Sequence, residues 1–173
     1  MKPLHVFGLE LTAVPSALAT YVALVGVGAL VAKKRRQLPL PATLVAGLAV
    51  AALHASSVLF HHFGHALFAR WTGHPMTGVR FWGGLATSVY PSDEPPLPAT
   101  VHLTRAAGGP LASLLLGIIL AAVTCSAARR SQVVSDLTLL GAFDNLFVLA
   151  LGSLMPLSFT DGATLIQWSR RTP

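Results

Sequence analysis

Residues 59–67 read Leu-Phe-His-His-Phe-Gly-His-Ala-Leu, a run of histidines inside the long apolar segment from Leu38 to Ala69. His61 and His65 are four positions apart, so on a helix both side chains project from one face, about one turn apart. Two imidazoles at this spacing can bind one zinc ion. His62 is rotated by about 100° from His61. The stretch therefore predicts an apolar helix that carries a metal site.

Long apolar segments dominate the chain of 173 residues. Four of them are Leu11 to Ala32, Leu38 to Ala69, Ala106 to Ala128 and Leu137 to Thr160. They contain no Lys, Arg or Glu, and each reaches the roughly 20 residues that a helix needs to cross a bilayer. Hydrophobic residues make up 53% of the chain and charged residues 10%, which excludes an ordinary soluble domain. The sequence predicts an all-α, multi-pass integral membrane protein of the cell membrane, with about four transmembrane helices.

The apolar pattern is interrupted between Met76 and Pro98. Val79 to Trp82 and Leu85 to Tyr90 are typical of two short strands, because the Gly83-Gly84 pair between them supplies the positive φ of a tight turn. We expect a short β-hairpin-like insertion between the second and third helices. We also expect two parts: residues 1–37 form an N-terminal transmembrane anchor, helical from about residue 9, with a basic connector, and residues 38–173 form the membrane core.

The net charge of +6 comes from clusters at the ends of apolar segments, chiefly Lys33-Lys34-Arg35-Arg36 and Arg129-Arg130. This placement indicates positive-inside anchoring to the lipid bilayer and no nucleic-acid partner. If both clusters face the cytosol, the loop from Trp71 to Pro98 lies outside. Arg170-Arg171 would then lie outside as well, so the charge pattern is not uniform.

Two histidines do not complete a catalytic zinc site, which has three protein ligands and one open position. The candidates for the third ligand are Asp161, Asp144 and His54. Asp161 lies between the helix breaker Pro156 and Gly162, where a broken helix can present a carboxylate inward. An Asp at this position also suits a helix N-cap. The residues alone therefore leave the third ligand open.

Three motifs in this chain resemble those of the site-2 protease family of intramembrane zinc metallopeptidases. The family patterns are H-E-x-G-H-A, G-P-x-x-N and N-x-x-P-x-x-x-x-D-G, each on a different membrane helix. The corresponding stretches here are His61 to Ala66, Gly109-Pro110-Leu111-Ala112-Ser113, and Ser153 to Gly162. Order and spacing agree, and the resemblance extends from about Leu38 to Trp168.

The resemblance implies that His61, His65 and Asp161 are the zinc ligands. It also implies that Gly109, Pro110, Ser113 and Ser153 support the site or hold substrate. The segment from Val79 to Tyr90 resembles the family's membrane-associated β element, whose exposed edge can align an extended substrate. The partner would be a single-span membrane protein, cut within or near the bilayer.

The chain departs from the family at three positions. His62 replaces the glutamate that acts as general base, and Ser113 and Ser153 replace two asparagines. A neutral imidazole can accept and return a proton, but it is bulkier than a carboxylate and can also bind the metal. The sequence therefore leaves three interpretations open: a peptidase impaired by the change from Glu to His, a non-catalytic pseudoprotease that binds transmembrane helices, and a metal-free, histidine-lined transport protein.

The resemblance and the charge pattern also disagree about orientation. The family's site usually lies nearer the cytosolic face of the membrane. The basic clusters instead predict that the end of the histidine helix lies outside.

Overall fold

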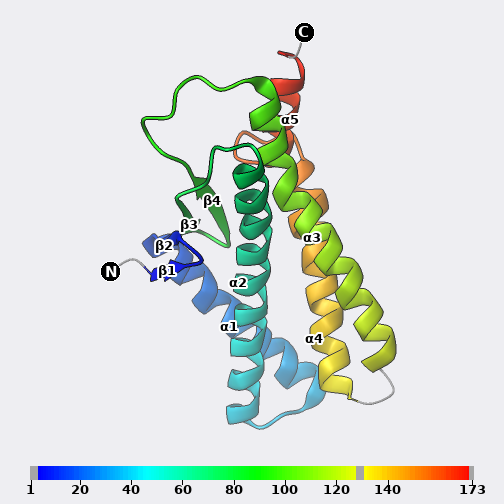
Figure 1. Cartoon of the computed structure of the whole chain (residues 1–173). Helices are drawn as coiled ribbons and strands as arrows, with labels where there is room; N and C mark the ends of the chain where they lie inside the picture. The colour runs from blue at the N-terminus through cyan, green and yellow to red at the C-terminus, as the bar shows by residue number, and fades with distance from the viewer. Residues whose placement is uncertain (1–3, 128–130, 172–173) are drawn as a thin grey trace.

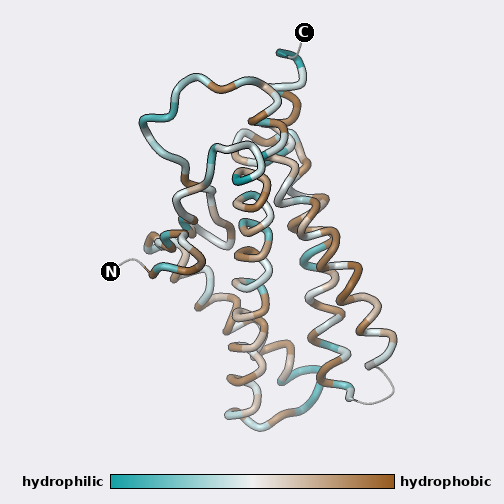
Figure 2. The backbone as a smooth tube through the Cα atoms, viewed as in Figure 1, coloured by the Kyte–Doolittle hydropathy of each residue, from teal (hydrophilic) through white to brown (hydrophobic). Residues whose placement is uncertain are grey.

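The computed structural model describes residues 4–127 and 131–171. It contains four helical stretches that are long and apolar enough to cross a membrane. They are α1 (Pro15–Arg36), α2 (Leu40–Trp71), α3 (Ala99–Ala127), and α4 (Gln132–Phe143) continued by the π-helix η1 (Asp144–Leu151) and the 3-10 turn η2 (Gly152–Leu154). Most of their residues are apolar (Figure 2), and many of their large hydrophobic side chains are exposed, as lipid contact requires. The prediction of a four-span, multi-pass membrane protein is confirmed.

Local sequence explains where these helices begin and end. Pro15 lies in the first turn of α1, where its missing N–H costs nothing. Gln37 closes α1 in a left-handed conformation, and its backbone N–H donates to the Lys33 carbonyl. Ser131 caps α4 by accepting a hydrogen bond from the Val134 backbone.

A small sheet packs beside the bundle, with strand order β1-β2-β3-β4. Its strands are β1 (Leu4–Val6), β2 (Leu9–Ala13), β3 (Gly78–Trp82) and β4 (Leu85–Val89). β3 and β4 form an antiparallel hairpin around Gly83, whose φ is 52°. The predicted hairpin between the second and third helices is confirmed.

The expectation of a helix from about residue 9 is wrong. Residues 9–13 are strand β2, which runs parallel to β3 and antiparallel to β1. The local sequence Leu9-Glu10-Leu11-Thr12 alternates apolar and polar side chains with period two, which suits a strand, and helix starts only at Pro15. Leu9 packs in a buried core with Ala69 of α2 and Val79 of β3. The N-terminal residues therefore pack directly on the rest of the protein, and the division at residue 37 stays a prediction.

The two ends of the bundle differ. α5 (Asp161–Ser169) and the C-terminus lie at one end, and the sheet lies beside the bundle, while the α1–α2 connection and the start of α4 lie at the other end (Figure 1). At the second end Arg36 forms an ion pair with Asp136. Arg129 and Arg130 lie outside the described residues. The cluster at the end of α1 is thus across the bundle from the hairpin, and the membrane side that each end faces stays a prediction.

Close contact between α2 and α3 brings the histidine motif of α2 and the Gly-Pro motif of α3 together. A Cβ at Gly64 would lie 2.3 Å from the Gly108 carbonyl oxygen, so only glycine permits this approach. The histidine turn of α2 consequently lies directly against the Gly-Pro turn of α3.

Candidate metal centre

His61 and His65 of α2 meet Asp161 at the start of α5. The two Nε2 atoms are 3.1 Å apart, and each lies 3.3 Å from one carboxylate oxygen of Asp161. Their side chains are 7%, 5% and 18% exposed, and one ligand atom of each residue lies within 4.8 Å of the others. The structure therefore brings together two imidazoles and a carboxylate in a largely buried cluster.

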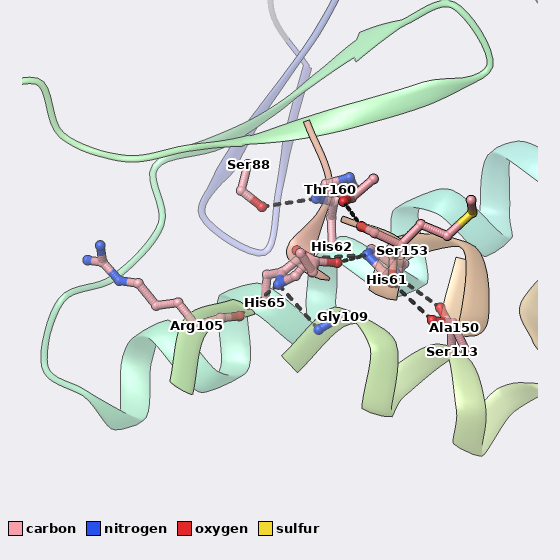
Figure 3. Close-up of polar contacts among 12 residues, drawn as sticks. His61, His62, His65, Ser88, Arg105, Gly109, Ser113, Ala150, Ser153 and Thr160 are labelled. Atoms are coloured by element: carbon pink, nitrogen blue, oxygen red, sulfur yellow. Dashed lines mark hydrogen bonds and ion pairs between the residues drawn. The ribbon is translucent and has the colours of Figure 1, made fainter. Parts of the chain in front are cut away.

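The second nitrogen of each ring contacts α3 (Figure 3). His65 Nδ1 lies 2.8 Å from the Arg105 carbonyl oxygen, and His61 Nδ1 lies 2.9 Å from Ser113 Oγ. The Gly109 backbone N–H also donates to His65 Nδ1, at 3.2 Å. Partners on α3 therefore hold the outer nitrogen of each ring, while both Nε2 atoms face Asp161, and fixed outer nitrogens are typical of histidines that bind metals.

Gly109 allows α3 to approach both Nε2 atoms closely. A Cβ at this position would lie 2.3 Å from His65 Nε2 and 2.4 Å from His61 Nε2. Pro110 follows it inside α3. The Gly-Pro turn therefore forms a wall of the cluster that carries no side chain at the point of convergence.

Gly162 allows the Asp161 carboxylate to reach the two histidines. A Cβ there would lie 2.1 Å from the Leu154 carbonyl oxygen, so α5 can approach η2 only with glycine after Asp161. Burial alone would raise the pKa of Asp161, but hydrogen bonds from His61 and His65 outweigh it and hold that pKa below its usual range. The carboxylate is thus kept ionised.

His62 takes a different direction from its neighbours. Its buried side chain points to β4, where Nδ1 lies 3.0 Å from Ser88 Oγ (Figure 3). The ring also contacts the backbone of Ala86. The residue at the position of the family's glutamate is thus engaged with the hairpin.

The two serines at the family's asparagine positions behave differently. Ser113 is fully buried and contacts His61, and its role as a site-supporting residue stays a prediction. Ser153 donates to the Ala150 carbonyl of its own helical turn, at 3.1 Å, and lines the cavity beside the cluster. That cavity, of about 550 Å³, is also lined by His62, β4 and Asp161.

His54 and Asp144, the other candidates for the third ligand, lie together away from the cluster. His54 Nδ1 is 3.0 and 3.1 Å from the two carboxylate oxygens of Asp144, and its Nε2 is 2.6 Å from the Gly84 carbonyl oxygen. Both ring nitrogens already have partners. Among the described residues, the cluster of potential metal ligands consists of His61, His65 and Asp161.

Sequence reasoning missed a charged group that supports the cavity. Arg105 is buried, pairs with Glu94 of the β4–α3 loop, and lies 4.0 Å over the Tyr90 ring. The hydrogen bond from Arg105 lowers the pKa of Glu94, and burial raises the pKa of Tyr90 to about 12. The only sequence signal was an arginine near the start of an apolar helix, with an acid in the preceding loop.

No protein-family model and no curated protein matches this chain. A solved structure does: the site-2 protease from Methanocaldococcus jannaschii, with a TM-score of 0.69 and 19% sequence identity. The match covers 96% of this chain and 69% of that one. It therefore extends beyond the three motifs and includes most of residues 1–37. The chain therefore has the fold of a site-2 protease.

Proposed function

We propose that this chain is a membrane-embedded zinc metallopeptidase homologue of the site-2 protease family, acting on transmembrane or membrane-proximal protein segments. Its peptide hydrolysis is impaired by the change from Glu to His at position 62. The observation that carries this proposal is the convergence of His61, His65 and Asp161 beside a cavity, in a membrane fold shared with a site-2 protease.

The donor set fits zinc. Two imidazole nitrogens and a carboxylate are ligands that catalytic zinc sites use. Gly109 carries no side chain that would push the two nitrogens apart, and Ser113 and the Arg105 carbonyl hold the outer nitrogens. A zinc ion bound there would supply a Lewis acid to polarise a peptide carbonyl. The remaining open side of the cluster would face the cavity.

The base is the weak part of this site. A general base must reach the proton that it removes, and His62 instead makes its contacts with Ser88 and Ala86. Its ring also brings no negative charge to the side of the cluster where the family has a carboxylate. Every 1.36 kcal/mol added to the barrier costs about tenfold in rate, so a misplaced base lowers hydrolysis by orders of magnitude.

The second candidate is a non-catalytic pseudoprotease that binds transmembrane helices and controls their fate without cutting them. The observation that favours it is an intact cavity and ligand cluster combined with a residue at position 62 that is tied to β4. The metal-free transport protein, the third interpretation, predicts solute passage without bound metal.

Reversion of position 62 tests the proposal. The parent, His62→Glu and His62→Gln would be reconstituted in liposomes with a panel of single-span reporter proteins, and cleavage followed by gel. His62→Gln is the matched control, because it has the size of glutamate but no base. We expect weak or no cleavage by the parent and the control, and clear cleavage by His62→Glu.

Each other result has a definite meaning. Cleavage by the parent that His62→Ala abolishes would show that histidine is the base. If the parent and His62→Glu both hold zinc and neither cuts any reporter, the peptidase proposal is wrong and the helix-binding role is the better account. Transport by zinc-free protein would overturn both.

A further inference from the structure

Within the part of the chain that the structure describes, one edge of β4 carries no strand. Among these residues β4 is the last strand in the sheet and pairs with β3 alone, through a hairpin with two residues in its turn. In such a hairpin the residues flanking the turn, Trp82 and Leu85, form a hydrogen-bonded pair, and hydrogen-bonded pairs then alternate along the strands. The backbone groups of Ala86 and Ser88 therefore point away from β3. The hydrogen bond from Thr77 N to Val89 O, at 2.9 Å, agrees with this alternation, because it shows that the Val89 carbonyl points toward the β3 side.

The free edge lies against α2, and two histidines of that helix contact it. His54 Nε2 is 2.6 Å from the Gly84 carbonyl oxygen in the hairpin turn, and the His62 ring contacts the Ala86 backbone. His62 Nδ1 also contacts the side-chain oxygen of Ser88 in β4, at 3.0 Å. The two histidines are eight positions apart, about two helical turns, so one contacts the turn and the other contacts the strand.

The other ring nitrogen of His54 contacts a carboxylate. Its Nδ1 lies between the two carboxylate oxygens of Asp144, at 3.0 and 3.1 Å, where α4 meets η1. Since both nitrogens of His54 face oxygen acceptors, the ring donates on both sides when it makes both contacts. The anchor thus joins the hairpin turn to two membrane helices.

We propose that His54 and His62 fasten the free edge of β4 to α2, so that an extended client segment can pair with this edge only after these contacts break. The proposal rests on the proposed function in one respect, which is that β4 is the edge where a client binds. It gives position 62 a role besides that of base or ligand. An imidazole N–H can donate to the Ala86 carbonyl, whereas an ionised glutamate there cannot.

Hydrogen exchange of β4 amides in the full chain, in lipid nanodiscs, tests the fastening. His62→Leu removes both contacts of the ring, and we expect the peptide covering residues 84–89 to exchange about tenfold faster than in the parent, as loss of one to two hydrogen bonds allows. His62→Glu should also exchange faster, and His62→Gln, which keeps a side-chain N–H, should lie between. His54→Leu should act in the same direction.

The matched control is His102→Leu. His102 lines the same cavity but stacks on Trp168 of α5, so its loss should leave exchange of residues 84–89 within twofold of the parent. If His62→Leu and His62→Glu both exchange like the parent, the fastening is refuted, even if His54→Leu does not fold. Equal acceleration by His102→Leu would refute it too, because the effect would then be general loosening of the cavity.

The outcome is separable from that of the zinc proposal. The same exchange comparison would be made after EDTA treatment, with zinc measured on each sample. A β4 difference that persists after EDTA treatment supports the fastening whether or not zinc was bound before. Absence of zinc before EDTA treatment counts against the metal site alone. Zinc-loaded protein without any β4 difference counts against the fastening alone.

Discussion

Histidines of α2 form two groups with carboxylates from other segments, and the groups differ in what the imidazole nitrogens contact. In the site cluster (His61, His65 and Asp161) the two Nε2 atoms point at one shared space beside Gly109. In the anchor pair (His54 and Asp144) both nitrogens are already taken, by the carboxylate and by the Gly84 carbonyl. The same residue types therefore suit a metal in one place and a structural link in the other. What separates them is the partner of the second nitrogen and the space left in front of the first.

The largest expected effect comes from filling that space. Gly109→Ala would place a Cβ within 2.4 Å of both Nε2 atoms, so the histidines could no longer point at a common ion. We expect zinc affinity to fall at least about a hundredfold, since even loss of supporting contacts costs 10–100-fold. Competition with a chelating zinc indicator measures it.

The control for this substitution is Gly26→Ala in α1, where the added Cβ would meet nothing within 4 Å. It should bind zinc like the parent. Parent-like affinity in Gly109→Ala would show that the ion does not lie where the two nitrogens converge.

The anchor pair should matter for stability and not for zinc. Asp144→Ala leaves His54 without its charged partner in a setting where the two side chains are only 16% and 12% exposed. Breaking a buried pair by removing one partner costs about 3–5 kcal/mol of the free energy of unfolding. Reversible unfolding in mixed micelles measures the loss, and zinc content should not change in the protein that remains folded.

Asp136→Ala is the matched comparison on the same helix. Its partner Arg36 is 46% exposed, and surface pairs contribute about 0–1 kcal/mol. If the two substitutions cost the same, the anchor pair is not the structural link described here.

A smaller, pH-dependent effect is expected at Glu94, which supports the cavity through Arg105. Glu94→Gln should lower the free energy of unfolding by about 1–2 kcal/mol at neutral pH, because Arg105 loses a charged acceptor. The pKa of Glu94 is lowered in the folded protein. The contribution is therefore complete above the unfolded value of about 4.3 and is lost as pH falls through the lower folded value.

Unfolding measured between neutral pH and about pH 3.5 should show the parent and Glu94→Gln converging at the acid end. Asp93→Asn, at the exposed neighbouring position, is the control and should show no such convergence. A difference that stays constant across this range would mean that the charge of Glu94 is not what stabilises the cavity.

Much of the fold followed from local sequence. Apolar segments long enough to span a bilayer gave four helices, and Gly83-Gly84 between alternating residues gave the hairpin. The three motifs also placed His61, His65 and Asp161 as one group, and these residues do converge in the structure. Their role as zinc ligands stays a prediction.

What sequence could not predict depends on contacts between distant segments. Strand β2 pairs in parallel with β3, although the two membrane helices α1 and α2 separate these strands in the sequence. The short apolar pattern of β2 also runs directly into the apolar helix that follows, so the sequence does not separate the two. The Arg105 and Gly84 carbonyls that fix His65 and His54 are backbone groups, which every residue type carries equally. The turn of His62 toward Ser88 likewise depends on where the hairpin packs.

Zinc content of the purified full chain tests the central claim most directly. We expect about one zinc per chain in the parent and in the anchor variant His54→Ala, and almost none in the double variant His61→Ala, His65→Ala. Undiminished zinc in the double variant, or a parent that holds no zinc after dialysis against a zinc buffer, would contradict the assignment of this cluster as the metal centre.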